Sequence, residues 1–405
     1  MLSTDEPTYD ISENELLGEF AAEVTAHVSS LLTQHEAKFE PGKYLRKLLA
    51  ICRYAGITRI ADLTGLDRLG LPAAQTIRPS ALSEVTSLGR GRSITHAAIG
   101  AIMEAFERYH AEMVPAKSTV LGNADELAIP EGLFDRQLVN STNSDWRQTP
   151  TRWIAAYDLR SGSRQIVPLE LVHTRYTDPP PDFDGLFVRT TTGLACHSTW
   201  HQAAAHGLFE CIERDAIARA FDTHGFFDRH RLAPESLGPA VNRLIGLLAE
   251  HDISVGFWHA PSPTGIAVVW CQTIEIGAGH PVLALPTEGY SAGQDFAKAA
   301  KNALCEALAT RAGAISGARD DQTTGHYHRR VDGPVAKARQ LILNPVSFTQ
   351  VVENRPVSTL QDLFDRVADA ELGPVFAVPL GSNSNGPVRC VRILMPRSRP
   401  FSIVR

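Results

Sequence analysis

The chain of 405 residues is long enough to form one large domain or two ordinary ones. Its residues are 43% hydrophobic and 21% charged, which is typical of a globular protein with a buried core. The net charge is −6, and the lysines and arginines are scattered along the chain. This composition argues against a nucleic-acid-binding protein, because such proteins need a concentrated basic surface.

The stretch 1–20 is acidic and lacks the basic and apolar regions of a secretory signal peptide. No apolar run reaches the roughly 18–20 residues that a membrane-spanning helix needs. The six cysteines are spread singly, without a Cys-x-x-Cys pair, which argues against a zinc knuckle and against a disulfide framework. We therefore expect a cytoplasmic protein with reduced thiols and no membrane partner.

Hydrophobic spacing predicts the secondary structure in chain order. A helical stretch within 11–53 places Leu16, Phe20, Val24 and Val28 on one face. Short apolar runs between glycines and prolines predict strands within 55–81, and a Ser-Gly-Ser turn predicts a hairpin over 151–172. Long helices are expected at 93–113, with Ser93 or Thr95 as the N-cap, at about 199–221 and near 294–315. Further strands are expected within 251–260, 264–275, 281–292 and 387–396, and loops at 178–185 and 382–387.

A strand-rich chain with three long helices predicts a mixed α/β architecture built around one site. No linker divides the chain cleanly. We therefore predict an N-terminal helical extension over residues 1–54 and one compound domain over residues 55–405.

Two stretches about a hundred residues apart share one pattern, in which small apolar residues lead into Glu-x-x-Glu-Arg. These residues are Glu104, Glu107 and Arg108 in the first stretch, and Glu210, Glu213 and Arg214 in the second. Residues i and i+3 lie on the same face of a helix, so each pair of glutamates projects together. A single pattern of this kind is usually a solvated helix face. Here nearly uncharged turns precede both patterns, which predicts buried carboxylates that need partners. A hard cation such as Mg²⁺, held together with phosphate oxygens, suits this cluster.

A third helix and a glycine-rich stretch extend the pattern. Glu306 and Arg311 follow another alanine-rich apolar turn. The stretch 87–93, Ser-Leu-Gly-Arg-Gly-Arg-Ser, precedes the first acidic helix. We expect its glycines to free backbone N–H groups for phosphate and its arginines to add positive charge. It matches neither a P-loop nor a dinucleotide-binding fingerprint. The sequence thus predicts a nucleotide site of another kind.

Together these residues resemble the YcaO superfamily, and the resemblance covers about residues 55–396. Four blocks occur in the family's order: Ser87 to Arg108, Thr192 to Asp215, Gly289 to Arg311, and Val391 to Pro396. The segment 56–72 is further similar to the branch of YcaO proteins that works beside a TfuA-like partner.

The resemblance implies an enzyme that uses ATP and Mg²⁺ to activate a backbone amide, whose oxygen takes the γ-phosphoryl group and leaves as phosphate. Sulfide as the nucleophile gives a thioamide, whereas a Cys, Ser or Thr side chain gives an azoline. The stretch 395–405 lacks the Pro-x-Pro-x-Pro ending of many azoline-forming members, which favours the thioamide. The implied partners are a TfuA-like protein, a precursor peptide or protein and a sulfide source. A homodimer is left open.

The resemblance also assigns the candidate site, residue by residue. The metal ligands would be Glu104, Glu107, Glu210 and Glu213. The ATP-binding residues would be Ser87, Arg90, Arg108, Gln202, Arg214, Glu306, Arg311 and Arg392. The chain departs from the family pattern with Arg90 for Lys, Thr192 for Asn, His197 for Gly, Gln202 for Glu and Ala309 for Gln. The first of these keeps the charge and changes its geometry.

Two rival functions are consistent with the same residues. One is an azoline-forming cyclodehydratase that acts on Cys, Ser or Thr of a precursor peptide. The other, which the departures favour, is a non-catalytic nucleotide-binding scaffold or regulatory protein. Cys196 and Cys211 flank the start of the second acidic pattern, but no sequence-adjacent His–Asp arrangement would activate them, so we interpret them as packing residues. His326 and His328 are interpreted as part of a polar loop.

Overall fold

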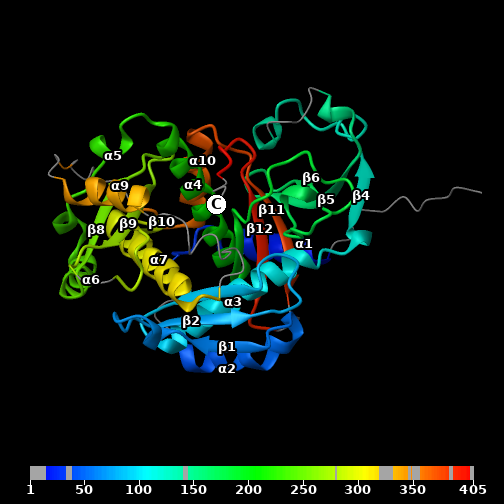
Figure 1. Ribbon diagram of the computed structural model, residues 1–405. Helices are drawn as coiled ribbons and strands as arrows, with labels where there is room; N and C mark the ends of the chain where they lie inside the picture. The colour runs from blue at the N-terminus through cyan, green and yellow to red at the C-terminus, as the bar shows by residue number, and fades with distance from the viewer. Residues whose placement is uncertain are drawn as a thin grey trace, which may run out of the picture.

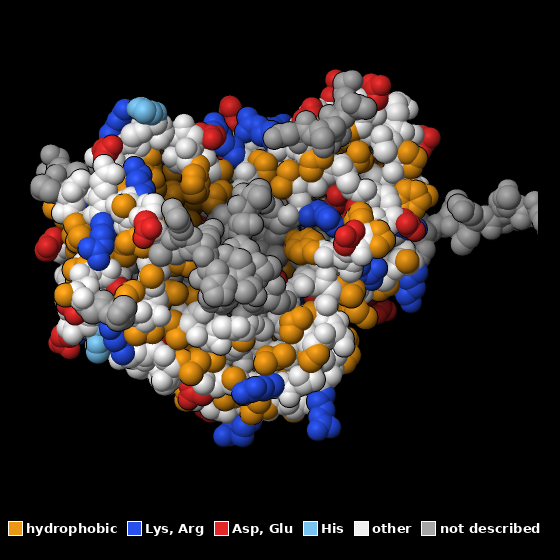
Figure 2. Space-filling model, in the orientation of Figure 1, with side chains coloured by type: hydrophobic (Ala, Val, Ile, Leu, Met, Phe, Trp, Pro, Cys, Tyr) orange, Lys and Arg blue, Asp and Glu red, His pale blue; other side chains and the backbone are white. Residues whose placement is uncertain are grey.

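The computed structural model describes residues 15–32, 39–139, 145–278, 281–318, 332–344, 348, 356–382 and 386–401. Within these ranges no helix combines the length and the apolar character that crossing a membrane requires. On the face seen in Figure 2, acidic and basic side chains are interspersed rather than gathered by sign.

Three antiparallel β-sheets surround the centre of the molecule (Figure 1). The first has the order β1-β2-β3, with β1 (Arg59–Asp62), β2 (Ala73–Ile77) and β3 (Thr86–Arg90). The second has the order β10-β9-β8, with β8 (Ile253–His259), β9 (Ala267–Glu275) and β10 (Thr287–Gly293). The third has the order β4-β5-β11-β12-β7, with β6 paired to β5. Its strands are β4 (Thr119–Gly122), β5 (Thr151–Asp158), β6 (Arg164–Pro168), β7 (Leu194–His197), β11 (Phe376–Ser382) and β12 (Arg389–Leu394).

Three long helices each follow a strand of a different sheet. They are α3 (Ile94–Glu112) after β3, α4 (Trp200–Asp222) after β7, and α7 (Phe296–Ser316) after β10. Helix α3 packs on β2 and β3, α7 packs on β9 and β10, and α4 contacts β7, β12 and β10. The other α-helices of the described residues are α1 (Glu15–His27), α2 (Pro41–Ile51), α5 (Phe226–Arg229), α6 (Pro239–Glu250), α9 (Asp332–Leu343) and α10 (Leu360–Asp369). The prediction of a mixed α/β architecture is confirmed.

Most predicted elements match the observed ones, and the differences concern short or irregular segments. The three long helices and the hairpin β5–β6 lie where the spacing predicts them, and Ser93 is the N-cap of α3. In the described part of 11–53, the predicted helical stretch corresponds to the two α-helices α1 and α2. In the predicted strand 281–292, only residues from Thr287 onward belong to β10. The sequence does not predict strands β3, β4, β7 and β11 or helices α5, α6, α9 and α10.

The two N-terminal helices pack into the body of the molecule. Phe20 and Val24 of α1 belong to the same buried core as Trp200. Glu23 Oε1 accepts hydrogen bonds from the backbone N–H groups of Trp200, at 2.7 Å, and His201, at 3.2 Å. Since the first N–H groups of a helix have no partner within it, Glu23 caps the N-terminus of α4. The predicted extension 1–54 thus supports the acidic helix α4.

Glycines allow the strands to approach the helices that follow them. A Cβ at Gly89 in β3 would overlap the carbonyl oxygen of Ala97 in α3, and a Cβ at Gly289 in β10 would overlap that of Ala303 in α7. The sequence predicts that glycines in 87–93 open a loop for phosphate. The structure differs, because Ser87–Arg90 belongs to the paired strand β3 and Gly89 is required by close packing.

Candidate functional site

The three long helices present glutamates at the same distance from their first turn. The N-caps Ser93, Thr199 and Asp295 each precede a glutamate by eleven residues, and these glutamates are Glu104, Glu210 and Glu306. Ser93 and Asp295 accept a backbone hydrogen bond from the residue three positions on, which fixes where their helices begin. The two acidic patterns are therefore parts of a threefold arrangement of strand followed by helix.

The first glutamate of each helix binds the preceding strand. Glu104 accepts a hydrogen bond from the N–H of Leu88 at 3.0 Å, and Glu210 accepts one from the N–H of Gly193 at 3.1 Å. Glu306 accepts one from the N–H of Tyr290 at 3.2 Å. In each case one carboxylate oxygen is fixed by a backbone N–H within the strand that precedes its helix or, for Gly193, directly before that strand.

The second glutamate of each acidic helix binds the strand of the next unit. Glu107 of α3 accepts a hydrogen bond from the N–H of Cys196 in β7 at 2.8 Å. Glu213 of α4 accepts one from the N–H of Ala292 in β10 at 3.1 Å. These contacts bring α3 to β7 and α4 to β10, so the four glutamates predicted as metal ligands belong to adjoining units.

Two arginines neutralise part of this negative charge. Arg214 lies within ion-pair distance of three carboxylates: Glu213 at 3.4 Å, Glu210 at 3.8 Å and Glu306 at 4.0 Å. Its guanidinium also lies over the ring of Tyr290, 5.6 Å from the centroid. Arg108 pairs with Glu104 at 3.1 Å and with Glu84 at 3.0 Å.

The carboxylates are held in an environment that disfavours their charge. Burial raises the pKa of Glu213 to about 8, and Glu306 and Glu210 raise it further against the opposing effect of Arg214. Burial also raises the pKa of Glu107 well above its usual value, and Glu104 and Glu210 add to this shift. The pKa of Glu210 is raised by burial, while Arg214 opposes the shift. Carboxylates on α3, α4 and α7 thus raise one another's pKa.

Three other predicted ATP-binding residues lie on β3 and α4, two of the elements that belong to these strand–helix units. Ser87 is buried in β3 beside Leu88, the partner of Glu104. Arg90 is exposed at the end of β3, and its Nη2 donates to the carbonyl oxygen of Asn302 in α7 at 3.4 Å. Gln202 lies in the first turn of α4, where its Oε1 accepts a hydrogen bond from Thr199.

Arg311 and Arg392 are both buried but differ in their surroundings. Arg311 lies in α7, and its guanidinium pairs with Asp67 at 2.8 Å and with Glu275 at 2.7 Å. The structure therefore brings it to β9 and to the segment before β2 rather than to the glutamates of α3 and α4. Arg392 in β12 acts electrostatically on Glu210. His326 and His328 lie outside the described residues.

The donor set fits Mg²⁺ bound together with a triphosphate. In the described part of the chain, no three side chains of His, Cys, Asp or Glu form a group that could hold a metal ion alone. Mg²⁺ is usually bound through one or two carboxylates and the substrate's phosphates, and keeps several waters. Carboxylates with raised pKa gain from a nearby cation, which favours their ionised form. Glu107, Glu210 and Glu213 are the residues that would hold it.

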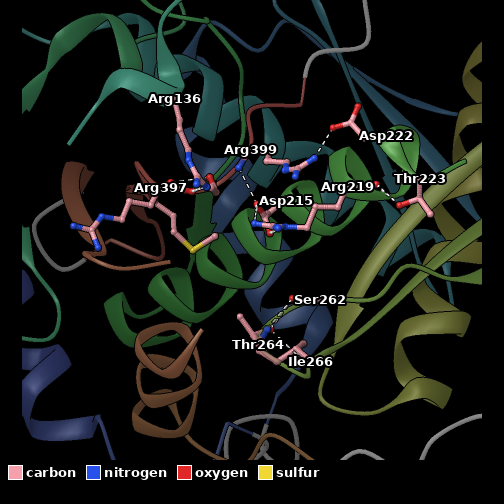
Figure 3. Close-up of polar contacts among 12 residues, drawn as sticks. Arg136, Asp215, Arg219, Asp222, Thr223, Ser262, Thr264, Ile266, Arg397 and Arg399 are labelled. Carbon is pink, nitrogen blue, oxygen red and sulfur yellow. Dashed lines mark hydrogen bonds and ion pairs between the residues drawn. The ribbon is translucent and has the colours of Figure 1, made fainter. Parts of the chain in front are cut away.

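Sequence reasoning missed the role of Asp215, which follows Arg214 directly. Asp215 is fully buried, pairs with Arg219 at 2.7 Å and accepts a hydrogen bond from the backbone N–H of Arg399 at 2.8 Å. Arg399 also pairs with Asp222 near the end of α4, as Figure 3 shows. The C-terminal segment 395–401 is thus fixed to the acidic helix. The sequence signal for this role is the aspartate that follows Glu-Arg within a buried helix.

A pH dependence of stability follows from the raised pKa of Glu213. Between about pH 4.5 and pH 8 the folded protein keeps a proton on this group that the unfolded chain has released. Stability falls as pH rises wherever the folded state binds more protons. We expect Glu213→Gln to become more stable relative to the wild type as the pH rises through this window, in urea unfolding without Mg²⁺ and nucleotide. A difference that does not change with pH would contradict the burial of this charge.

Comparison with known proteins gives the family of the chain. Residues 88–399 match the family model described as YcaO cyclodehydratase, ATP- and Mg²⁺-binding. An uncharacterized protein of Methanothermobacter thermautotrophicus is 29% identical over 386 residues, which cover 91% of this chain and 96% of that protein. An uncharacterized protein in the tfuA 3′ region of Rhizobium leguminosarum bv. trifolii is 27% identical over 386 residues, which cover 89% of this chain and 88% of that protein.

Among solved structures, YcaO from Methanopyrus kandleri bound with AMPPCP and Mg²⁺ has a TM-score of 0.64 at 24% identity. The match covers 88% of this chain and 91% of that one, which confirms the fold. The predicted cofactors, ATP and Mg²⁺, are those of the family's description. Because the family model covers most of its length, the chain belongs to the YcaO family.

Proposed function

We propose that the chain is an ATP-dependent enzyme that converts a backbone amide of a ribosomally made peptide or protein into a thioamide. The observation that carries the proposal is the partly buried carboxylate cluster from three helices in a chain of this family. When bound, ATP supplies the γ-phosphoryl group and Mg²⁺ neutralises phosphate charge.

The residues of the cluster would position rather than react. Phosphoryl transfer depends mainly on positioning and charge neutralisation. Glu107, Glu210 and Glu213 would hold Mg²⁺, each with one oxygen already fixed by a backbone N–H. Arg214 would keep its three carboxylates oriented and favour their ionised form.

In the proposed reaction a hydrosulfide ion adds to the amide carbon, and the amide oxygen takes the γ-phosphoryl group of ATP. ADP leaves in this transfer. The C–O bond then breaks, phosphate departs with the proton that the hydrosulfide carried, and the sulfur remains doubly bonded to the carbon as the thioamide. The tfuA-region relative supports this branch, as does the resemblance of segment 56–72 to TfuA-associated proteins. We accordingly propose a TfuA-like protein as partner, a precursor peptide or protein as substrate and a reduced, cytoplasmic setting.

A second candidate function is azoline formation from Cys, Ser or Thr of a precursor peptide. The family's description as a cyclodehydratase favours it. The same cluster would serve both reactions, because both require phosphorylation of the amide oxygen, and they differ in the nucleophile.

The test is to combine the protein, Mg²⁺·ATP, sulfide, a TfuA-like protein and a precursor peptide encoded beside it. We expect phosphate release that requires the peptide, and a peptide whose mass rises by the exchange of one oxygen for sulfur. A loss of one water from the peptide would indicate the azoline product instead. ATP binding without phosphate release under all of these conditions would contradict the enzyme and favour a scaffold.

A further inference from the structure

A small cavity lies beside the acidic cluster, between the segment before β7, helix α4 and strand β12. Its volume is about 40 Å³, and its lining includes Thr192, Cys211 and Arg392. Thr192 directly precedes Gly193, whose N–H binds Glu210, and Cys211 directly follows Glu210. The cavity therefore adjoins the carboxylate that we predict to bind Mg²⁺.

Arg392 is a buried cation with an unused donor. Its side chain is 2% exposed. Nε donates to the carbonyl oxygen of Leu171 at 3.0 Å, and Nη2 donates to that of Thr190 at 2.6 Å. Nη1 is buried as well, and no hydrogen-bond acceptor reaches it within the described part of the chain. A buried charge with an unsatisfied N–H destabilises a protein unless a partner of opposite charge is supplied, so this geometry indicates an anionic ligand.

The size and lining of the cavity restrict the anion. A cavity needs roughly 10–15 Å³ of such volume to hold one water molecule, so about 40 Å³ fits an ion of a few atoms. Among the described residues that line it, Arg392 alone carries a charge, which matches a single negative charge on the ligand. Leu171, Val188 and Leu394 make part of the wall apolar, and the polar lining residues Gln137 and Ser398 already donate to backbone carbonyl oxygens. An apolar wall suits a polarizable sulfur anion better than a phosphate dianion, which needs several donors.

We propose that this cavity binds the hydrosulfide ion, with the Arg392 guanidinium paired to its charge. The inference rests on the proposed function, because the cavity would hold the sulfur nucleophile of thioamide formation. It assigns Arg392 to the nucleophile rather than to the triphosphate, and it places that nucleophile beside Glu210, at the edge of the predicted Mg²⁺ site.

The test fills the cavity without changing Arg392. In Val188→Phe the larger ring takes up the space that the ion would occupy. We therefore expect the KM for sulfide to rise by about tenfold or more, while the KM for ATP changes little. The control is Val282→Phe, which adds the same ring at an exposed valine outside the lining. Far-UV circular dichroism and urea unfolding establish that both variants are folded. A wild-type KM for sulfide in folded Val188→Phe would overturn the proposal.

Direct binding separates this inference from the proposed function. Anaerobic calorimetry with sodium hydrosulfide, without ATP or peptide, is expected to show binding to the wild type and about tenfold weaker binding to Val188→Phe. Binding of inorganic phosphate but not of hydrosulfide would overturn the proposal. Cavity-dependent hydrosulfide binding without any thioamide product would retain the site and reject the function. Thioamide formation with an unchanged sulfide KM in Val188→Phe would retain the function and reject the site.

Discussion

Glu213→Gln is expected to lower peptide-dependent phosphate release by about 100-fold or more while the protein stays folded. The substitution keeps the size of the side chain and its ability to accept the hydrogen bond from Ala292. It removes the negative charge that Mg²⁺ requires. Because burial raises the pKa of Glu213 to about 8, the free protein holds this group protonated below that pH, and the substitution resembles that neutral form. Glu107→Gln, on the neighbouring helix, is expected to have the same effect.

The measurement is steady-state phosphate release with saturating peptide, with urea unfolding as the check on folding. Glu250→Gln provides a matched control, because Glu250 is an exposed residue at the end of α6. We expect the control to keep wild-type turnover. Wild-type turnover in either Glu107→Gln or Glu213→Gln would contradict a metal site shared by α3 and α4.

Arg214→Gln is expected to reduce both turnover and stability. The guanidinium lies within 4.0 Å of three carboxylates, so its removal leaves them without a common counter-charge. We expect the free energy of unfolding to fall by about 1–3 kcal/mol and turnover to fall by about 100-fold. Added Mg²⁺ should stabilise the variant more than the wild type, because a bound cation replaces the missing charge.

Thermal unfolding with and without Mg²⁺ measures this difference. Arg219→Gln is the control, since Arg219 lies on the same helix and pairs with Asp215 rather than with the glutamates. It should lose stability without a gain in Mg²⁺-dependent stabilisation. An equal Mg²⁺ effect in Arg214→Gln and Arg219→Gln would contradict the role of Arg214 as the common counter-charge.

The long helices and the glutamates could be predicted from the sequence because their signals are local. An apolar turn followed by Glu-x-x-Glu-Arg determines which side chains share a helix face, and that holds in α3 and α4. The hydrogen bonds that Glu107 accepts from β7 and Glu213 accepts from β10 join residues about eighty to ninety positions apart. No local pattern contains such contacts, since they depend on how the three sheets surround the centre.

Arg311 illustrates how a one-residue difference changes a predicted contact. Arg108 and Arg214 follow Glu104 and Glu210 by four residues, whereas Arg311 follows Glu306 by five. One residue rotates a side chain by about 100° around the helix, which directs Arg311 to Asp67 and Glu275. The spacing is visible in the sequence, but the partners of Arg311 in other segments cannot be identified from it. The short strand β7 and the cap that Glu23 provides for α4 likewise become visible only in three dimensions.

We propose that α3, α4 and α7 together form one Mg²⁺·ATP site. A crystal structure of the protein grown with Mg²⁺ and a non-hydrolysable ATP analogue tests it most directly. We predict a triphosphate between α3 and α4, with Mg²⁺ bound by carboxylate oxygens of Glu107, Glu210 or Glu213 and by phosphate oxygens. A nucleotide bound elsewhere, with these carboxylates contacting only the backbone and Arg214, would contradict the account.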